Sequence, residues 1–467
     1  MNATIGSLKL FILLSALTGS VYFAAFQGGF HYDDSLTILE NPHLDRWRTF
    51  VGHLDHMVRP VLYGTFLLDR SLYGTNPAGY HLLNVLLHLG SGILIYLILT
   101  RAVTERQSSV PFWTALLFLI HPIATETVTY LSGRTSGLMT FFYLSAFLLY
   151  VKTLEPSGTV KLHRLYLSGA VASFALSIGS KETAVTLPIM FLLWDMVIRG
   201  LKGPSLQSAV LSRYLPFGVV LLFAVGWAWS HPRYAGLAQF SLTIRPLWDN
   251  LLSELHAWGY ALALFFTPWN QNFDHDLPVF HSLTQWPLPL DLLLLSATFA
   301  AGLFSWRRFP LAAFGLGWFF IQLLPTSLIP RNDLLSERNL YLPSIGLLLA
   351  IVTLGSYLAQ RLAMIVSRPR LVQFASMSVA TAFVIGLCLF TFQRNQLYQN
   401  RVSFWSDTVL KSPNKARPHN NLGYAYALEG DWDRAIGEFR TAAKLDPDFM
   451  IAQQNLRDAY LHRLGRQ

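Results

Sequence analysis

The sequence predicts an all-α, polytopic transmembrane helical bundle that carries a short helical extension after its last span. Two observations lead to this fold class. Only 13% of the 467 residues are charged, whereas a soluble domain has about 25%, and the mean hydropathy is +0.38. Apolar runs close to the roughly 20 residues that a helix needs to cross a bilayer recur along most of the chain.

Much of the net charge of +9 lies in short loops between the apolar runs. In a soluble protein this excess would suggest a nucleic-acid partner. We expect none here, because basic loops between spans follow from the positive-inside rule. The only cysteine, Cys388, lies inside an apolar run, which excludes a disulfide within the chain and a cysteine metal cluster and predicts an inert, packed thiol.

The apolar runs define the expected spans. They are 8–27, 82–100, 111–125, 136–151, 165–179, 184–198, 214–230, 250–267, 289–305, 310–328, 340–359 and 373–392. The first run could instead be the core of a signal peptide. Its basic region is a single Lys9 and no small-residue cleavage site precedes a soluble domain, so we expect an uncleaved first span.

Basic residues in the loops orient the bundle. With the N-terminus inside, the loops that carry them are cytoplasmic at every step but one. These residues are Arg101, Arg106, Lys152, Lys161, Arg164, Arg199, Lys202, Arg213, Arg307, Arg308, Arg361, Arg368 and Arg370. The exception is the run 250–267, which contains Glu254 and His256. We expect a partial or re-entrant segment there and about eleven full spans in total, although a charged helix that faces the bundle interior can also span.

This topology places the polar segments of the chain on one side of the membrane. The outside segments are 28–80, 121–135, 180–183, 231–249, 268–288, 329–340 and everything after about 394. The polar signatures described next fall in these segments or at their edges. The sequence therefore predicts an active site on the non-cytoplasmic face.

Two adjacent carboxylates, Asp33 and Asp34, follow the first span directly in the stretch FHYDDSLTILENP. Neighbouring carboxylates raise each other's pKa, which makes one of them a candidate general base. The pair could also hold a divalent cation through its oxygens, or be a solvated or helix-capping pair. The position immediately outside the first span favours a functional role.

Two basic residues lie where expected spans meet the outside: Lys181 in SIGSKETAVTLP and Arg338 in SERNLYLPS. A lysine at such a place can neutralise a lipid phosphate, or can simply extend to the membrane surface. A buried arginine binds phosphate or carboxylate through two parallel hydrogen bonds. Glu182 follows Lys181 directly, and Glu337 could be the partner of Arg338.

The third expected span breaks at Pro122, which follows His121 in LIHPIATETVTYLSGRTSGL. Beyond the break, Glu126 and Arg134 could pair across the bend. Charges at this depth serve either a site or such an ion pair, and the sequence leaves the two alternatives open.

Three other groups of polar residues lie in or beside the outside loops. Arg59 precedes an apolar-aromatic stretch that predicts amphipathic helices at the membrane interface. One helical face carries His81, Asn84 and His88, and a later loop carries Asn272, Asp274 and Asp276. The first trio could bind zinc or be polar packing between spans, and the second could line the site or bind metal.

The chain changes character after the last span, so we divide it into a membrane domain, 1–393, and a polar helical domain, 394–467. Residues 416–449 resemble one tetratricopeptide repeat. The repeat pattern is carried by Leu422, Gly423, Tyr426, Gly430, Ala435, Phe439, Ala442 and Pro447, with His419 where tryptophan is common. Helices of neighbouring repeats are expected at 397–412 and after Asn455. Because about three repeats are needed for stability, this short array should lean on the membrane domain, either as a docking element or as a holder of a peptide acceptor.

No phosphate-binding glycine loop and no Rossmann-like alternation of strands and helices is present, so the sequence shows no nucleotide-sugar site. A glycosyl donor on the outside would have to be lipid-linked. An apolar groove with basic residues suits such a donor.

Several segments occur together and in order: FHYDDSLTILENP, RPVLYGTFLLDRSLYGTNPAGYHLLNVLLH, LIHPIATETVTYLSGRTSGL, GSKETAVTLP and SERNLYLPSIG, followed by the repeat. The chain thereby resembles the transmembrane and tetratricopeptide repeat-containing O-mannosyltransferases and their bacterial relatives. The resemblance implies a C-type glycosyltransferase fold and inverting transfer from a polyprenyl-phosphate sugar, mannose in known members, to Ser/Thr of protein. The repeat array is shorter than in that family, which leaves acceptor and sugar open.

The resemblance also implies roles for the residues above. Asp33 or Asp34 would be the base, Lys181 and Arg338 with Arg134 or Arg59 would hold the donor phosphate, and His121, Glu126, Glu182, Glu337 and Asp274 would line the site. The sequence assigns no cofactor, and a divalent cation stays open. The alternatives are a lipid or glycan acceptor, or a membrane scaffold or transporter that recruits partners through its repeats. Short repeats and the lack of glycosylation sequons in the outside loops favour a bacterial inner membrane, with site and repeats in the periplasm.

Overall fold

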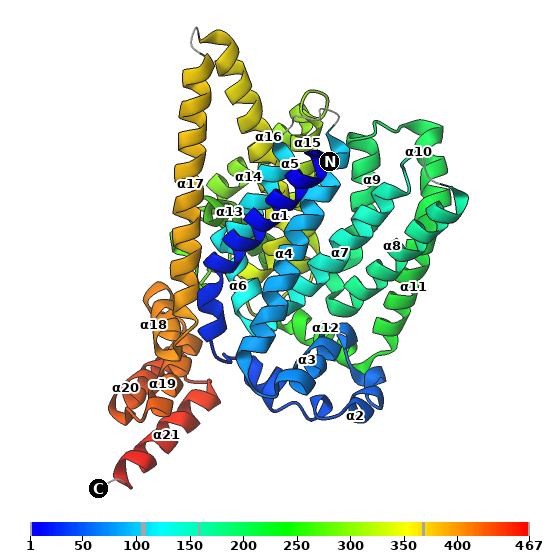
Figure 1. Ribbon diagram of the computed structural model, residues 1–467. Coiled ribbons are helices and arrows are strands. Elements are labelled where there is room, and N and C mark those ends of the chain that lie inside the picture. The colour runs from blue at the N-terminus through cyan, green and yellow to red at the C-terminus, as the bar shows by residue number, and fades with distance from the viewer. Residues whose placement is uncertain (1, 104–108, 157–158, 367–368, 466–467) are drawn as a thin grey trace.

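The computed structural model describes residues 2–103, 109–156, 159–366 and 369–465, and every regular element within these ranges is helical (Figure 1). The all-α prediction is therefore confirmed. Arg106 and Arg368 lie outside the described residues. The first helices are α1 (Asn2–Val21), α2 (Trp47–Val51), α3 (Pro60–Tyr73), α4 (Pro77–Ala102), α5 (Val110–Ile120), α6 (Thr125–Thr129), α7 (Arg134–Lys152), α8 (Val160–Ser180), α9 (Leu187–Val197), α10 (Gly203–Ala209) and α11 (Leu215–Ser230). The rest are α12 (Pro232–Ile244), α13 (Leu247–Phe266), α14 (Leu288–Ser305), α15 (Pro310–Ser327), α16 (Tyr341–Ile365), α17 (Pro369–Leu397), α18 (Arg401–Lys411), α19 (Ala416–Glu429), α20 (Trp432–Leu445) and α21 (Met450–Leu464).

The chain is a multi-pass membrane protein. Seven of its described helices are long and apolar enough to cross a bilayer, or eight if the bent pair α5 and Pro122–Thr129 forms one span. The expected number, about eleven, was higher because each apolar run was counted as one span. The run 184–198, for example, forms only the 11 residues of α9. The bend of 55° falls at the expected break before Pro122.

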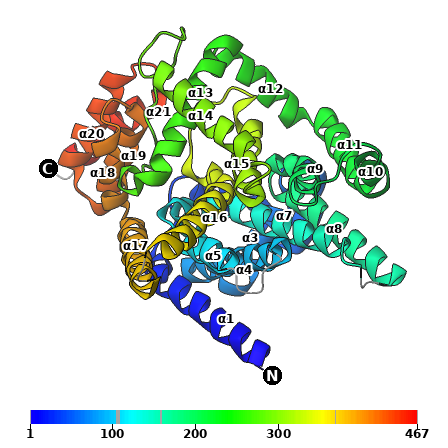
Figure 2. The same ribbon diagram turned by 90° about the horizontal axis from the view of Figure 1, so that it is seen from above.

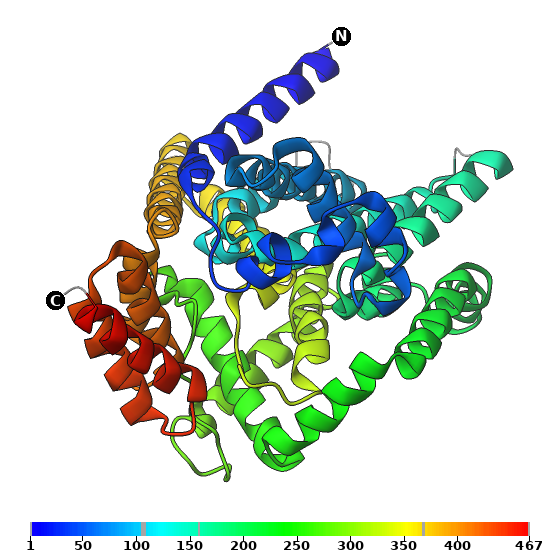
Figure 3. The same ribbon diagram turned by 90° about the horizontal axis from the view of Figure 1, so that it is seen from below.

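Helix α13 corresponds to the run 250–267, which was the exception to the positive-inside pattern. It is continuous over 20 residues but is not among the candidate spans. At its start, Asn250 donates to the carbonyl of Ser327 at the end of α15. Just beyond its end, Gln271 donates to Glu337, in the segment that follows α15. Both ends of α13 therefore face the same end of the bundle. Figure 3 shows α12 and α13, in green, lying lengthwise across that end.

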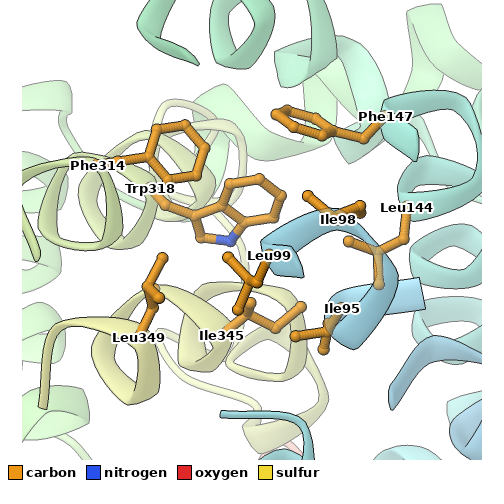
Figure 4. Close-up of a pocket in the computed structure, with 10 residues that line it drawn as sticks. Ile95, Ile98, Leu99, Leu144, Phe147, Phe314, Trp318, Ile345 and Leu349 are labelled. Carbon is orange, nitrogen blue, oxygen red and sulfur yellow. The ribbon is translucent and has the colours of Figure 1, made fainter. Parts of the chain in front are cut away.

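The core of the bundle is built from α4, α5, α7, α15 and α16. Helices α15 and α16 cross closely at Gly315 and Gly346, where a Cβ atom on either residue would overlap the backbone of the other helix. Figure 4 shows an apolar pocket between α4, α7, α15 and α16. It holds 340 Å³ of space, part of it open to solvent. Its walls consist of aliphatic and aromatic side chains, among them Phe147 and Trp318. No charged group lines it, so the polar chemistry lies elsewhere.

One end of the bundle carries the short helices α2 and α3 and the four last helices, α18 to α21 (Figures 1 and 3). We call it the repeat-bearing end. Helix α3 buries Phe66 and Leu67 and exposes Leu68 and Leu72, so it is amphipathic as expected for a helix at a membrane interface. The charges of Arg307 and Arg308 follow α14 at the opposite end, and Figure 2 views the molecule from that side.

Helices α19 and α20 form the repeat. Gly430 ends α19 with φ of 80°, which favours glycine, and Asp431 caps α20 by accepting from the backbone N–H of Arg434. Gly423 lets α19 approach the ring of Phe439 in α20, which a Cβ would meet at 2.7 Å. The boundary predicted between 393 and 394 falls within the last turn of α17, which continues to Leu397.

Candidate active site at the repeat-bearing end

The segments expected outside the membrane meet at the repeat-bearing end. The backbone N–H of Asp33 donates to the Tyr130 hydroxyl at 3.1 Å, which joins the first loop to the bend of the third span. Lys181 donates to Asn339 at 2.7 Å, which joins the loop after α8 to the segment before α16. Residues distant in sequence therefore form one polar region.

The two adjacent carboxylates lie in different surroundings. Asp34 is fully buried and accepts three hydrogen bonds, from the His31 N–H at 2.8 Å and from the N–H and hydroxyl of Ser132 at 2.8 and 2.5 Å. Burial raises the pKa of Asp34 to about 7, against the effect of these donors. Asp34 thus fastens the turn to the start of α7.

Asp33 is half-buried, and no ion pair engages its carboxylate in the part of the chain that is described. Burial raises its pKa, while the charges of Arg338 and Arg417 oppose that rise. Tyr32 before it has φ of 47° and contacts the rings of Phe273 and Trp405. This left-handed turn separates the two carboxylates, so that only Asp33 stays reachable.

Lys181 and Arg338 line one small cavity together. It holds 270 Å³ of space, part of it open to solvent, and its wall includes Ser136, Gln322 and Asn339. The Lys181 ammonium donates to Ser136 at 2.8 Å and to Asn339 at 2.7 Å, both neutral groups. Burial, with the nearby charges of Arg59 and Arg338, holds the pKa of Lys181 well below its usual value. An anion bound in this cavity would contact the Lys181 amine and the Arg338 guanidinium together and would favour the charged form of Lys181.

The structure changes two expected pairings. Arg338 faces Glu126, at 3.7 Å, rather than Glu337, and its guanidinium lies 5.8 Å from the centre of the Tyr130 ring. Glu126 also accepts from the backbone N–H of Arg338 at 3.0 Å. Glu337 instead accepts from Gln271 and from the backbone N–H of Asn272. Glu337 therefore holds the loop after α13, and Glu126 positions Arg338.

Arg134 lies outside the polar region, contrary to its expected role at the donor phosphate. It is fully buried and forms an ion pair with Asp69 at 2.5 Å. It also donates to Asn84 at 2.6 Å and to the Tyr80 carbonyl at 2.8 Å. The pairing with Glu126, which the sequence left as one of two alternatives, is not formed, because Asp69 of α3 supplies the buried counter-charge.

Other expected residues hold the framework together. Arg59 donates twice to Glu182, at 2.7 and 3.2 Å, beside Lys181, and this pairing lowers the pKa of Glu182 to about 2 although burial raises it. His121 stacks on Phe265 with ring centres 4.4 Å apart and caps the turn after Pro122. None of these four side chains lines the cavity of Lys181 and Arg338.

Asp274 binds the repeats to the membrane domain. It pairs with Lys415 at 2.5 Å and with Arg417 at 2.5 Å, and Arg417 also pairs with Asp333 at 2.6 Å. Arg417 lies 5.9 Å from the centre of the Tyr32 ring. The repeats therefore contact the turn that carries Asp33, as the short array was expected to do.

The metal alternatives find no support in the geometry. Among the residues that the structure describes, no group of three or more His, Cys, Asp or Glu side chains could hold a metal ion. His88 of the suspected trio donates from Nε2 to the Leu119 carbonyl, and its Nδ1 hydrogen-bonds the Tyr341 hydroxyl, which is packing between spans. Since three donors occupy the oxygens of Asp34, the Asp33–Asp34 pair is no shared cation site either.

Sequence reasoning missed the neutral residues of the site. Tyr130 joins Asp33 to Arg338, Ser132 holds Asp34, and Asn339 binds Lys181. All three lie inside the segments quoted above, one to four residues from a charged candidate. Their polar side chains among apolar neighbours were the available signal.

The chain resembles curated O-mannosyltransferases over nearly its whole length. A tetratricopeptide repeat family matches residues 416–449, as the pattern predicted. "Protein O-mannosyl-transferase F38B6.6" of Caenorhabditis elegans is 26% identical over 94% of this chain, and "Protein O-mannosyl-transferase TMTC3" of Homo sapiens is 26% identical over 97%. The alignments cover 63% and 53% of these relatives, so the chain spans little more than half their length. The family resemblance indicated by the ordered segments is thereby confirmed.

A solved structure aligns as well. ArnT from Cupriavidus metallidurans bound to undecaprenyl phosphate matches with a TM-score of 0.46 and 14% identity, over 88% of this chain and 80% of that chain.

Proposed function

We propose that the chain is an integral membrane glycosyltransferase of the C-type, which moves a sugar, mannose, from a polyprenyl-phosphate donor to a Ser/Thr hydroxyl of protein. The relatives' names support the sugar, the reaction and the protein acceptor. One observation carries the proposal: Asp33, whose backbone N–H donates to the Tyr130 hydroxyl, and Arg338, whose guanidinium lies over the Tyr130 ring, meet at the same residue. A base and a phosphate-binding group are thus adjacent.

In this proposal Asp33, rather than Asp34, is the general base. Asp33 takes the proton from the acceptor hydroxyl while the oxygen attacks the anomeric carbon. The bond between that carbon and the phosphate oxygen breaks, and polyprenyl phosphate leaves from the opposite face, so the configuration inverts. Asp34 keeps the turn in place through its three hydrogen bonds.

The donor phosphate would bind in the cavity of Lys181 and Arg338. The phosphate gains negative charge as it leaves, and fixed cations in a buried place stabilise that charge more strongly than water would. Lys181 contacts neutral groups only, and Arg338 is held by a single ion pair with Glu126 at 3.7 Å. Arg59 supports the cavity through Glu182 instead of binding the phosphate.

The acceptor would approach beside the repeats, since Trp405 of α18 and Arg417 of α19 both contact Tyr32, next to Asp33. We place this face in the periplasm of a bacterial inner membrane, because the opposite end carries the basic turn of Arg307 and Arg308. A protein acceptor fits an open face next to helical repeats.

The test is transfer of labelled mannose from a polyprenyl-phosphate donor in membranes that contain wild type or Asp33→Asn. We expect labelled protein with wild type and a loss of at least about 10²-fold with the variant, the usual contribution of a general base. If lipid or glycan were labelled instead of protein, that molecule and not protein would be the acceptor. Absence of transfer with wild type would instead favour a scaffold or transporter.

A further inference from the structure

A polar cavity lies between the outside segment 28–80 and the start of α12. Its wall includes His43, His53, His56, Tyr63, Arg233 and Glu40. A water-sized sphere can move through 360 Å³ of this space. Since ligand pockets commonly hold about 300–1,000 Å³, the cavity has room for a small polar ligand. Among the described residues its lining has none in common with the cavity of Lys181 and Arg338, so the two are separate sites.

Several polar groups of this wall have no partner in the described part of the chain. The guanidinium of Arg233 has no carboxylate within 4 Å, and the Nδ1 atom of His43 is buried without a hydrogen bond. His53 uses Nδ1 for the Thr49 carbonyl at 2.8 Å, which leaves Nε2 for a ligand. One fixed cation and imidazoles that can become cationic therefore face a single carboxylate, that of the exposed Glu40.

The surface around the cavity suits contact with a membrane that carries negative charge. Trp47 of α2 is exposed between Arg46 and Arg48, which are exposed as well. Leu36 in the cavity wall and Val51 at the end of α2 also expose apolar side chains. Tryptophan is enriched where hydrocarbon meets the headgroups, and basic residues are attracted to anionic lipids there. The cavity therefore lies next to a surface that fits the membrane interface.

From these observations we propose that the cavity binds the phosphate of an anionic membrane lipid whose acyl chains stay in the bilayer beside α2. Arg233 would bind two phosphate oxygens through parallel hydrogen bonds. The imidazoles of His43 and His53 would donate to the same group when protonated, and the charge of the phosphate favours that state. Glu40 would accept from a hydroxyl of the headgroup, which phosphatidylglycerol has.

A lipid in this cavity would link two parts of the outside face. The cavity is formed by the segment 28–80 together with Arg233 of α12. Thr37 lies in its wall, and the backbone N–H of Thr37 donates to the carbonyl of Asp33 at 2.8 Å. A bound lipid would therefore join α12 to the turn that carries Asp33. Binding does not depend on sugar transfer, so it can be tested alone.

Protection of a thiol measures the binding directly. In a Cys388→Ser background, Thr37→Cys places a single thiol in the cavity wall, and Leu36→Cys provides a second reporter beside it. The purified full-length protein is labelled with the neutral reagent methyl methanethiosulfonate. Dihexanoyl-phosphatidylglycerol, a soluble short-chain lipid, should slow the labelling, whereas dihexanoylglycerol, which lacks the phosphate, should leave the rate unchanged. Equal labelling with both compounds would overturn the proposal.

Arg233→Gln tests the phosphate contact. A hydrogen bond to a charged group contributes about 1.5–3 kcal/mol, so the half-protecting lipid concentration should rise about 10- to 100-fold. Arg48→Gln is the matched control, because Arg48 is exposed on the same surface and does not line the cavity. A basic residue near an anionic surface contributes about 1 kcal/mol, so this variant should change the concentration by no more than about fivefold. Equal effects of the two variants would mean general attraction and no site.

The source of the phosphate distinguishes a lipid from a solute. Glycerol 3-phosphate and inorganic phosphate carry the same group without acyl chains, so they should protect the thiol only at much higher concentrations. If either protected as well as the lipid, the cavity would bind free phosphate. Stronger protection by a short polyprenyl phosphate would make it part of the donor site, and stronger protection by an acidic peptide would make it an acceptor site. Each of these results would overturn the lipid assignment, whether or not the chain transfers sugar.

Discussion

At the scale of single residues, the adjacent carboxylates of Asp33 and Asp34 differ in what they do: one is accessible and the other holds the turn in place. The positive φ of Tyr32 turns the chain so that Asp34 points into the protein and Asp33 stays half-exposed. From the sequence both were equal candidates for the base. The donors that distinguish them, His31 N–H and the two groups of Ser132, come from backbone geometry and from a residue 98 positions away. No local pattern could have shown this.

The two carboxylates should therefore respond differently to the same substitution. Asp34→Asn replaces one carboxylate oxygen by an NH₂ group, which cannot accept a hydrogen bond from the donors that face it. The donors left without an acceptor should lower the free energy of unfolding by about 1–3 kcal/mol. Asp33→Asn should leave unfolding unchanged while transfer falls by at least about 10²-fold. Thermal unfolding of the purified variants and their transfer rates provide the comparison. The reverse pattern would make Asp34 the base.

The acid side of the pH profile gives a second test of Asp33. Burial raises its pKa above the usual value of about 3.9, against the charges of Arg338 and Arg417. A general base acts only when deprotonated, so transfer should fall as the pH drops through this raised pKa, at a higher pH than an ordinary aspartate would give.

Arg417 offers a way to shift that acid limb. Arg417→Gln removes a charge that favours the ionised form of Asp33, so the midpoint should move to higher pH. The control is Arg434→Gln, whose guanidinium is exposed and pairs with Asp431 in the repeat. An acid limb that stays in place in Arg417→Gln would argue against Asp33 as the titrating group.

At the scale of elements, the sequence was most informative where a pattern is local. The repeat at 416–449, the break before Pro122 and the amphipathic α3 all follow from spacing or from a single residue type. Pairings between residues of different elements were harder to predict from the sequence. Arg134 was matched with Glu126 because both lie in one segment, yet Asp69 is its partner, since α3 folds back on α4 and α7.

The ion pairs of Asp274 connect an element to the site. Asp274→Asn should weaken the hold on Lys415 and Arg417, because the buried carboxylate is the shared partner of both cations. Amide hydrogen exchange should then rise in α18 to α21 before the membrane helices are affected. Asp433→Asn is the matched control: its pair with Arg463 is exposed on both sides, and such pairs contribute roughly 0–1 kcal/mol. Equal exchange in both variants would mean that apolar contacts such as Phe273 with Trp405 suffice to hold the repeats.

At the scale of the whole molecule, the charge pattern of the loops and the position of the polar region agree. Loops distant in sequence meet at the repeat-bearing end, and the turn of Arg307 and Arg308 lies at the other. The number of spans was overestimated, because an apolar run shows what is hydrophobic and not how far it extends as a helix. Glu254 and His256 correctly marked α13 as unusual, and the partner of His256, Asp291 of α14, became visible only in three dimensions.

The orientation of α13 leads to a test of the whole topology. In a Cys388→Ser background, Thr243→Cys and Ser282→Cys place single exposed thiols on either side of α13, and Ser305→Cys places a half-buried thiol at the opposite end of α14. Because both ends of α13 face the repeat-bearing end, a membrane-impermeant thiol reagent added to intact spheroplasts should label positions 243 and 282 alike. Position 305 should be labelled only after the membrane is permeabilised, since α14 separates it from 282. If 243 and 282 were labelled from opposite sides, α13 would span, the later loops would invert, and Glu254 would lie at membrane depth instead of near the cavity of Lys181 and Arg338.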